Sequence, residues 1–348
     1  MLKYTKLIPQ NIAPKGATGI GVYESVYDAD GKRVDGKRVG WIPLGPLAPE
    51  KREPLFSFGL VSDIHVADAA TQDWRCHASA HFDAALTFFE ERDCAFCAHA
   101  GDMTLIGFWR DAADASIYTG QLAEYRRILD LHPDIPVYGI TGNHESYNKP
   151  ITDNTAELNQ YAGFGLYHDY IHGEHDAFLF VGQPASYTTI NDEEVAWLSS
   201  KLTEYADKRC HVFVHVFPPN DSGNPNNCYS HAVFGSNAAA VKTLLANHGR
   251  AILYHGHSHV MYRIQELDET SNFCDKNGYP SVHVPSVSHS MGIEQLDDGT
   301  WTRWTDWEES QGAIVDVYDD CIVINGYSFT AARPEPHGTL KIDVGGTP

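Results

Sequence analysis

Five short polar fragments follow apolar runs in the sequence, and they carry the kinds of side chain that bind metal ions. The fragments are Asp63-Ile64-His65, Gly101-Asp102, Gly142-Asn143-His144-Glu145, His215 and Gly256-His257-Ser258-His259. In the first fragment, an extended chain would place Asp63 and His65 on the same side, because side chains alternate along a strand. An Asp and a His at this spacing are common by chance, so the pair gains meaning only from the other fragments.

Together the fragments offer carboxylate, amide and imidazole ligands but no thiolate. This mixture suits Mn, Fe or Zn, and the absence of thiolates argues against a structural zinc site. The candidates are more numerous than one tetrahedral ion needs. Two ions that share a bridging carboxylate would use them, so the pattern predicts a dinuclear centre.

The elements that would position these fragments alternate between apolar runs and helical patterns from Phe56 onward, which predicts an α/β layered fold. Because ligands gather at the carboxyl ends of parallel strands, fragments that follow separate strands can meet at one edge. The sequence predicts strands over 56–62, 96–100, 137–141, 178–181, 211–216 and 251–255, and helices over 77–92, 115–131, 192–206 and 237–248. Further β-structure is expected at 282–287 and over 313–325, with a turn at Asp319-Asp320.

The ordered fragments resemble the calcineurin-like metallophosphoesterase superfamily, whose pattern is D-x-H, G-D, G-N-H-[D/E], H and G-H-x-H. The resemblance covers roughly residues 56–290 and implies a four-layer αββα sandwich with two sheets and a dinuclear site at one end. It implies one ion held by Asp63, His65, Asp102 and His259, and a second held by Asp102, Asn143, His215 and His257, with Asp102 bridging. His144 would then stand beside the ions as general acid or substrate ligand, and Glu145 would accept hydrogen bonds behind them.

Departures from two branches of this superfamily narrow the expected reaction. Ser/Thr protein phosphatases carry G-D-x-x-D-R-G, but Leu105 and Ile106 stand here where the Asp and Arg would be. Purple acid phosphatases place a metal-binding Tyr at the position of Leu105. What remains resembles the phosphodiesterase branch.

The leading hypothesis is therefore hydrolysis of a small phosphodiester by a hydroxide that bridges two metal ions, with His144 protonating the departing alkoxide. Two alternatives stay open. One is a phosphomonoesterase, and the other is a non-catalytic, metal-stabilised binding or assembly module.

Several other residues have competing interpretations. His231 and His289, together with Asn143, are candidates for substrate binding, whereas His99 and His255 are expected to be hydrogen-bonded core histidines. The segment Trp301–Trp307 suits either stacking of a sugar or base, or packing on a core or sheet edge. His77 and His81 have helical spacing but lack the Glu of an HExxH protease motif. The pair Cys94 and Cys97 is expected to be buried and structural.

Composition limits the partners. The net charge of −21 repels phosphate backbones, which disfavours a nucleic-acid or anionic-membrane binder and leaves a small phosphoester as the expected substrate. The seven cysteines do not form the dense, even pattern of a disulfide-stapled secreted domain. No signal peptide or transmembrane run is visible, so a cytoplasmic location is expected. The sequence does not predict an oligomeric state.

The domain organisation follows from the same patterns. Residues 1–54 predict an N-terminal β-hairpin extension with a Pro-rich linker, in which Asp-Gly-Lys-Arg-Val occurs twice, over 30–34 and 35–39. We interpret this repeat as a lengthened hairpin tip. Residues 55–335 predict the metallophosphoesterase domain, and 336–348 a C-terminal tail.

Overall fold

The structure is a computed structural model, and all contacts given below lie within the residues that it describes. These are residues 3–6, 19–23, 26–27, 33–34, 38–43, 53–67, 77–105, 115–146, 155–183, 190–216, 235–262, 273–274, 278–295, 301–335 and 338–344.

The larger of two main sheets has the strand order β1-β20-β18-β17-β6-β7-β8, with β19 paired to β18. Its strands are β1 (Lys3–Lys6), β6 (Phe56–Val61), β7 (Cys97–His99), β8 (Val137–Gly139), β17 (Gln311–Val317), β18 (Cys321–Ser328), β19 (Arg333–Pro334) and β20 (Leu340–Asp343). β6, β7 and β8 are parallel, whereas β17 pairs antiparallel with both β6 and β18. The turn expected at Asp319-Asp320 joins β17 to β18.

The second main sheet has the order β13-β14-β12-β11-β10-β9. Its strands are β9 (Tyr167–His172), β10 (Asp176–Val181), β11 (Arg209–Phe213), β12 (Ala251–His255), β13 (Phe273–Cys274) and β14 (Ser281–His283). β10, β11, β12 and β14 run parallel. Three smaller pairs are β15 (Ser290–Gln295) with β16 (Trp301–Asp306), β2 (Gly19–Tyr23) with β5 (Arg38–Pro43), and β3 (Val26–Tyr27) with β4 (Arg33–Val34).

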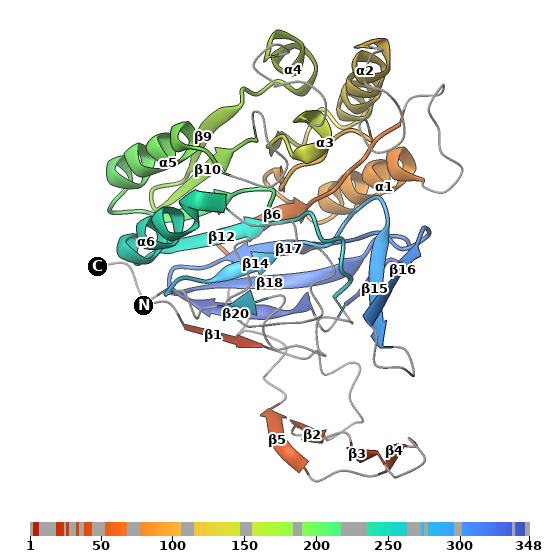
Figure 1. Cartoon of the computed structure of the whole chain (residues 1–348), viewed down its shortest axis with the longest axis vertical. Coiled ribbons are helices and arrows are strands. Elements are labelled where there is room, and N and C mark those ends of the chain that lie inside the picture. The colour runs from red at the N-terminus through yellow and green to blue at the C-terminus, as the bar shows by residue number, and fades with distance from the viewer. Residues whose placement is uncertain are drawn as a thin grey trace.

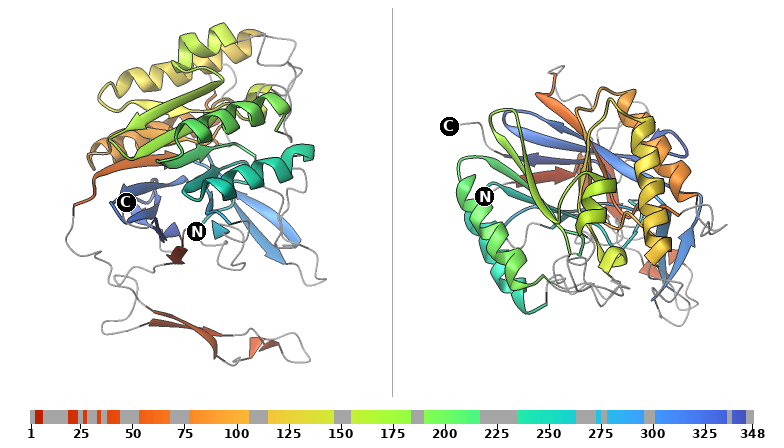
Figure 2. Two further views of the ribbon diagram at one scale, coloured as in Figure 1. Left: turned by 90° about the vertical axis from the view of Figure 1, so that its left-hand side faces the viewer. Right: turned by 90° about the horizontal axis from the view of Figure 1, so that it is seen from above.

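Helices cover the outer faces of both main sheets. α1 (Ala78–Glu90), α2 (Ala115–Leu131) and α4 (Thr155–Ala162) pack on the larger sheet, and α5 (Asp192–Glu204) and α6 (Ala238–His248) on the second. Figures 1 and 2 show these two groups of helices on opposite sides of the strands. The short α3 (Asn143–Ser146) and the 3-10 turn Gly235–Asn237 complete the helices of the described residues. The four-layer αββα sandwich expected from the sequence is confirmed.

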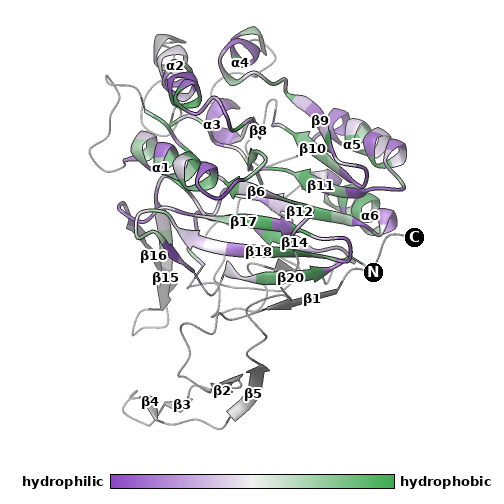
Figure 3. Cartoon of the chain, turned by 180° about the vertical axis from the view of Figure 1, so that it is seen from behind, coloured by the Kyte–Doolittle hydropathy of each residue, from purple (hydrophilic) through white to green (hydrophobic). Residues whose placement is uncertain are grey.

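Buried apolar side chains separate the layers. Phe58 and Leu60 of β6 lie between the two sheets, whereas Val61 faces the helices of the larger sheet. Both faces of β6 are thus buried, which explains why the strand reads as a continuous apolar run. Figure 3 shows the central strands as mostly hydrophobic, while α2 and α5 carry both hydrophilic and hydrophobic residues.

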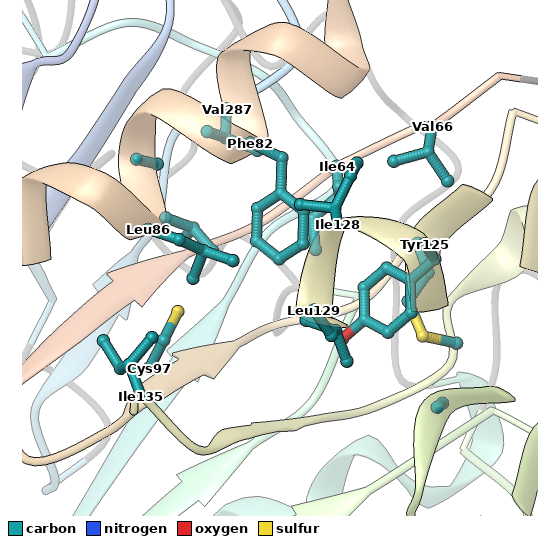
Figure 4. Close-up of a cluster of buried hydrophobic side chains, with 14 of the residues drawn as sticks. Ile64, Val66, Phe82, Leu86, Cys97, Tyr125, Ile128, Leu129, Ile135 and Val287 are labelled. Carbon is teal, nitrogen blue, oxygen red and sulfur yellow. The ribbon is translucent and has the colours of Figure 1, made fainter. Parts of the chain in front are cut away.

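The apolar cluster between the larger sheet and its helices holds the segment that carries the first candidate ligands. In Figure 4, Ile64 lies with Phe82 of α1 and Ile128 of α2, and Val66 lies close by. Ile64 and Val66 are completely buried. Ile64 separates Asp63 from His65 and Val66 follows His65, so their burial fixes the chain after Asp63 and on both sides of His65.

Some elements were not expected from the sequence. The strands β1 and β20 pair with each other inside the larger sheet, although they belong to the segments assigned to the extension and the tail. Both are four residues long, and pairing between chain ends leaves no local pattern. The helix α4, the strand β9 and the hairpin β15–β16 were also not predicted. No helix within the described residues is long and apolar enough to cross a membrane.

Candidate metal centre

Loops that follow five parallel strands bring the predicted ligands together. Asp63 and His65 follow β6, Asp102 follows β7, Asn143 and His144 follow β8, His215 follows β11, and His257 and His259 follow β12. Main-chain hydrogen bonds join these loops, including Asp63 N to Gly101 O (3.0 Å) and His65 N to Asp102 O (2.9 Å). The site is therefore assembled at one edge of the sandwich, where the carboxyl ends of the strands meet.

Asp63, His65 and His259 form the first ligand cluster. Nε2 of His259 lies 3.0 Å from Oδ1 of Asp63, and the Nε2 atoms of His65 and His259 are 3.1 Å apart. All three residues are buried. Their spacing lets one small cation contact all three.

Asp102, His215 and His257 form the second cluster, with Asn143 beside them. Nε2 of His215 lies 3.1 Å from Oδ2 of Asp102, 2.9 Å from Oδ1 of Asn143 and 3.2 Å from Nδ1 of His257. Oδ2 of Asp102 is also 3.8 Å from Nε2 of His65. Asp102 therefore lies between the two clusters, as a bridging ligand must.

Hydrogen bonds to main-chain carbonyls orient three of the imidazoles. Nδ1 of His65 lies 3.2 Å from Thr104 O, Nδ1 of His215 lies 2.8 Å from Ala100 O, and Nδ1 of His259 lies 3.3 Å from His289 O. A carbonyl only accepts, so Nδ1 carries the proton and Nε2 presents a lone pair.

These Nε2 lone pairs face carboxylate and amide oxygens, which are also acceptors. Such an arrangement of acceptors is stabilised by cations. The residues present therefore fit two metal ions in their donor chemistry.

The environment sets the charges of these ligands. Burial alone would raise the pKa values of Asp63 and Asp102, but the surrounding histidines outweigh it and hold both pKa values below the ordinary range. Burial, reinforced by neighbouring histidines, lowers the pKa values of His65 and His257 to about 3. Burial opposes protonation of His215, yet Asp102 and Asp63 raise its pKa to about 9. Except at His215, these shifts favour the ionised carboxylates and neutral imidazoles that metal ligands require.

Five of the candidate ligands have left-handed backbone conformations. The φ angles are 52° at Asp63, 49° at His65, 54° at Asp102, 73° at His257 and 57° at His259. The premise that an extended chain aligns Asp63 with His65 is therefore wrong, because β6 ends at Val61 and both residues follow it with left-handed φ angles. Such conformations are uncommon for residues other than glycine and cluster at functional sites.

Two glycines of the motifs allow the close approach of these loops. A Cβ at Gly256 would overlap the Ser62 hydroxyl and the Asp63 carboxylate. A Cβ at Gly142 would overlap the carboxylate of Asp102. The glycines are thus required by the contacts between ligand loops.

His144 lies beside both clusters. Its main-chain N–H donates to Oδ1 of Asp102 (2.9 Å), and its Nε2 is 3.8 Å from Oδ2 of the same residue. Nδ1 lies 3.4 Å from the carbonyl of Leu105, which orients the ring. Burial lowers the pKa of His144, although the charge of Asp102 opposes this. His144 is also close enough to His65 and Asp102 to share an ion with them.

Glu145 joins two ligand loops from behind. Oε1 accepts from the main-chain N–H and the hydroxyl of Thr104 (both 2.8 Å), and Oε2 accepts from Gly142 N (2.7 Å). Burial and the charge of Asp102 raise the pKa of Glu145 to about 7. The carboxylate therefore positions the loops that carry Asp102 and Asn143.

The remaining predicted residues fall into different places. His231 lies outside the described residues. The ring of His289 is buried next to His259, with centroids 4.5 Å apart, and 4.7 Å from the ring of Trp307. His99 contacts Tyr125 Oη through Nε2 (3.1 Å) and accepts from Gly101 N through Nδ1 (3.3 Å), as expected of a core histidine.

The cysteine and helix-histidine candidates lie away from the ligand clusters. Cys94 and Cys97 are buried free thiols, and burial raises the pKa of both, to about 12 at Cys94. His77 contacts Glu308 (3.4 Å), and His81 lies 2.8 Å from the carbonyl of Ser288 through Nδ1. Neither pair forms a metal site within the described residues.

Ser286 is a positioning residue that the sequence did not reveal. Its buried hydroxyl donates to the carbonyl of Asp63 (2.9 Å) and accepts from the main-chain N–H groups of Ser288 (3.1 Å) and His289 (3.2 Å). It thus helps hold Asp63 in its left-handed conformation. The only signal in the sequence is a run of small polar residues before His289.

Comparisons with known proteins agree with this geometry. The family model described as calcineurin-like phosphoesterase matches residues 56–261. The fold is similar to a dimetal phosphatase from Danio rerio, with a TM-score of 0.59 and 17% identity over 84% of this chain and 100% of that chain. It is also similar to a purple acid phosphatase from seeds of yellow lupin (Lupinus luteus), with a TM-score of 0.56 and 13% identity over 90% of this chain and 57% of that chain. No curated protein sequence matches the chain. At these identities the structural likenesses show a shared fold.

Proposed function

Because the chain belongs to the calcineurin-like phosphoesterase family and is a phosphoric ester hydrolase, we propose that it hydrolyses a small phosphodiester at a dinuclear metal centre. The observation that carries this proposal is that imidazole Nε2 atoms and the carboxylate oxygens of Asp63 and Asp102 lie close together. All of these atoms can donate a lone pair to a metal ion. The ring orientations that create this arrangement depend on main-chain carbonyls from separate loops.

We assign one ion to Asp63, His65, Asp102 and His259, and the other to Asp102, Asn143, His215 and His257. Mn, Fe and Zn suit this donor set. When bound, two such ions supply a nucleophile from water at neutral pH and stabilise charge on the phosphoryl oxygens. Asp102, between the clusters, sets the separation of the two sites.

His144 is the proposed general acid. Leu105 O holds the Nδ1 proton, so Nε2 is the atom that delivers a proton to the departing alkoxide oxygen. A bound phosphate anion favours the protonated imidazole, which offsets the effect of burial on its pKa. The main-chain N–H of His144 donates a hydrogen bond to Asp102. This bond holds the proposed general acid next to the residue that lies between the two sites.

Asn143 and His289 are the proposed substrate contacts. His289 is fixed through Nδ1, which lies 2.7 Å from Oγ of Ser288, and no described residue hydrogen-bonds its Nε2. That nitrogen is therefore suited to a substrate oxygen. A contact from His231 and a cytoplasmic location stay predictions from the sequence.

The absence of one phosphate-binding Arg from the motif favours a diester over a monoester. Ile106 stands where the Ser/Thr protein phosphatases of this superfamily carry the Arg that grips the phosphate. A monoester carries a second negative charge on its phosphoryl group, and phosphoryl-transfer sites commonly bind that charge with Arg or Lys.

A two-substrate assay tests the proposal. With Mn²⁺ present, we expect bis-p-nitrophenyl phosphate to be hydrolysed with a higher kcat/KM than p-nitrophenyl phosphate, and the variant Asp102→Asn to lose both activities. The opposite preference would indicate the phosphomonoesterase alternative. Bound metal without turnover of either compound would favour the binding or assembly module.

A further inference from the structure

The register of the hairpin β15–β16 brings an aromatic ring to the edge of the metal centre. Ser290 pairs with Asp306 at the open end of this hairpin. His289 directly precedes β15 and Trp307 directly follows β16, so these two residues lie next to each other beyond the last pair. Their rings are in contact in a tilted arrangement, with centroids 4.7 Å apart and planes 34° apart. Figure 1 shows the hairpin at the right-hand side of the sandwich.

The hairpin is tied directly to a ligand loop. Met291 N donates to the carbonyl of His259 (2.7 Å), and Met261 N donates to the carbonyl of Met291 (3.0 Å). His259 in turn donates through Nδ1 to His289 O. Main-chain hydrogen bonds that join His259 and Met261 to the hairpin therefore link the position of Trp307 to that of the ligand His259.

Rings form a continuous row from the ligands to Trp307. His65 stacks on His259 at 5.0 Å, His259 contacts His289 at 4.5 Å, and His289 contacts Trp307. Two ring contacts thus separate Trp307 from the nearest ligand. A ribose or another short linker between phosphorus and a planar group can span such a distance.

Trp307 is half-buried, and it belongs to none of the apolar clusters formed by the described residues. Trp304 of the same hairpin differs, because its ring lies over Gly292 on the opposite strand, where a Cβ would overlap it. Trp304 therefore packs within the hairpin, whereas Trp307 contacts the ring of His289 beside a ligand loop.

We propose that Trp307, backed by His289, is a specificity-determining residue that stacks the planar group of a nucleoside or aryl phosphodiester. This inference rests on the proposed function and names the substrate class of the same site. Stacking of a base on an aromatic side chain changes binding by about tenfold, and it is tolerant of the identity of the base. The proposed class is thus a small diester with at least one flat ring.

Two esters that share a leaving group test the proposal in the full-length, Mn²⁺-loaded protein. They are the p-nitrophenyl ester of thymidine 5′-phosphate and methyl p-nitrophenyl phosphate. We expect the wild-type protein to have a kcat/KM for the thymidine ester about tenfold above that for the methyl ester. Trp307→Leu should abolish this preference mainly through KM, whereas Trp307→Phe should retain most of it.

Trp304→Leu is the matched control, because it removes an indole of the same hairpin whose ring lies over Gly292. It should keep both activities and their ratio. Equal kcat/KM values for the two esters in the wild-type protein, or an unchanged ratio in a folded Trp307→Leu variant, would overturn the inference while leaving the phosphodiesterase proposal intact. If the wild-type protein hydrolysed neither ester, the proposed function would fail, and the inference with it.

Discussion

At the scale of single residues, the site depends on how each imidazole is turned. The carbonyls of Thr104, Ala100 and His289 select which ring nitrogen faces the centre, and Leu105 does the same for His144. A main-chain carbonyl thus replaces the carboxylate that the sequence lacks at position 105. The chemistry of the ligands is a consequence of main-chain geometry in neighbouring loops.

His144→Ala should reduce kcat about 10²–10⁴-fold, because general acid catalysis contributes roughly that factor. Metal content should be unchanged, since the proposed ligands remain. Steady-state kinetics and elemental analysis of the same preparation check both points. A loss of bound metal in this variant would show that His144 is a ligand, which its distance to Asp102 Oδ2 permits.

Ser286→Ala should weaken metal binding at the site of Asp63 more than at the site of His215. The Asp63 carbonyl loses one hydrogen bond, and the left-handed conformation of that residue is less well held. Titration with Mn²⁺ should reveal one weakened and one nearly normal site. Ser57→Ala is a matched control, since that hydroxyl donates to Oδ1 of Asp316 (2.6 Å) near the start of β6, at the end of the strand away from the ligands. Equal weakening of both sites by Ser286→Ala would contradict the assigned role.

At the scale of elements, a buried ion pair joins the two sheets at the end of the strands opposite the metal centre. Arg209 of β11 makes two hydrogen bonds to Asp176 of β10 (2.7 and 2.6 Å). It also donates to the carbonyl of Tyr318, in the β17–β18 turn of the other sheet (2.5 Å). Both side chains are almost completely buried.

Asp176→Ala should lower the free energy of unfolding by about 3–5 kcal/mol, because it leaves the Arg209 charge buried without a partner. Urea denaturation with the metals at saturation measures this change. Asp130→Ala, which breaks the exposed pair with Arg126, should change stability by less than about 1 kcal/mol. If the two variants lowered the free energy of unfolding by similar amounts, burial would not be the reason that the Arg209–Asp176 pair matters.

His132, directly after α2, contacts two acids of α1 in a way that depends on pH. Its ring is buried, which opposes protonation, but contacts with Glu90 (2.8 Å) and Asp83 (2.9 Å) outweigh this effect and raise the pKa of His132 above the ordinary value. A raised pKa in the folded state means that the protonated ring stabilises the fold.

This stabilisation should be complete below about pH 6.5, the ordinary value of histidine, and should be lost as the pH rises through the pKa of the folded state. The difference in unfolding free energy between the wild-type protein and His132→Gln should therefore shrink from pH 6 to pH 9. Both proteins are compared free of metal, so that proton competition at the ligands is the same in each. A difference that grows with pH would contradict the assignment.

At the scale of the whole molecule, the layers and the ligand set were predictable from the sequence for one reason. Strands such as β6 and β12 are buried on both faces, so they are apolar runs that end abruptly at polar residues. The family resemblance then assigned the polar residues after these strands to two metal ions. The helices and strands that were predicted between α1 and β18 lie within a few residues of their observed bounds.

The contacts that were not predictable all depend on tertiary structure. The pairing of β1 with β20 joins opposite ends of the chain. The left-handed conformations of Asp63 and Asp102, and the hydroxyl of Ser286 under Asp63, depend on loops that meet only in the folded sandwich. Short strands and main-chain acceptors leave no periodic signal in the sequence, so neither the extent of the larger sheet nor the supports of the site could be inferred from it.

The most direct test of the central claim is the metal stoichiometry of the purified protein after reconstitution with Mn²⁺ and removal of excess ion. A dinuclear centre predicts about two ions per chain in the wild-type protein, and about one in Asp63→Asn, with the fold retained by circular dichroism. Fewer than about one ion per wild-type chain, or full occupancy and full activity in Asp63→Asn, would contradict a dinuclear metallophosphoesterase centre built on these residues.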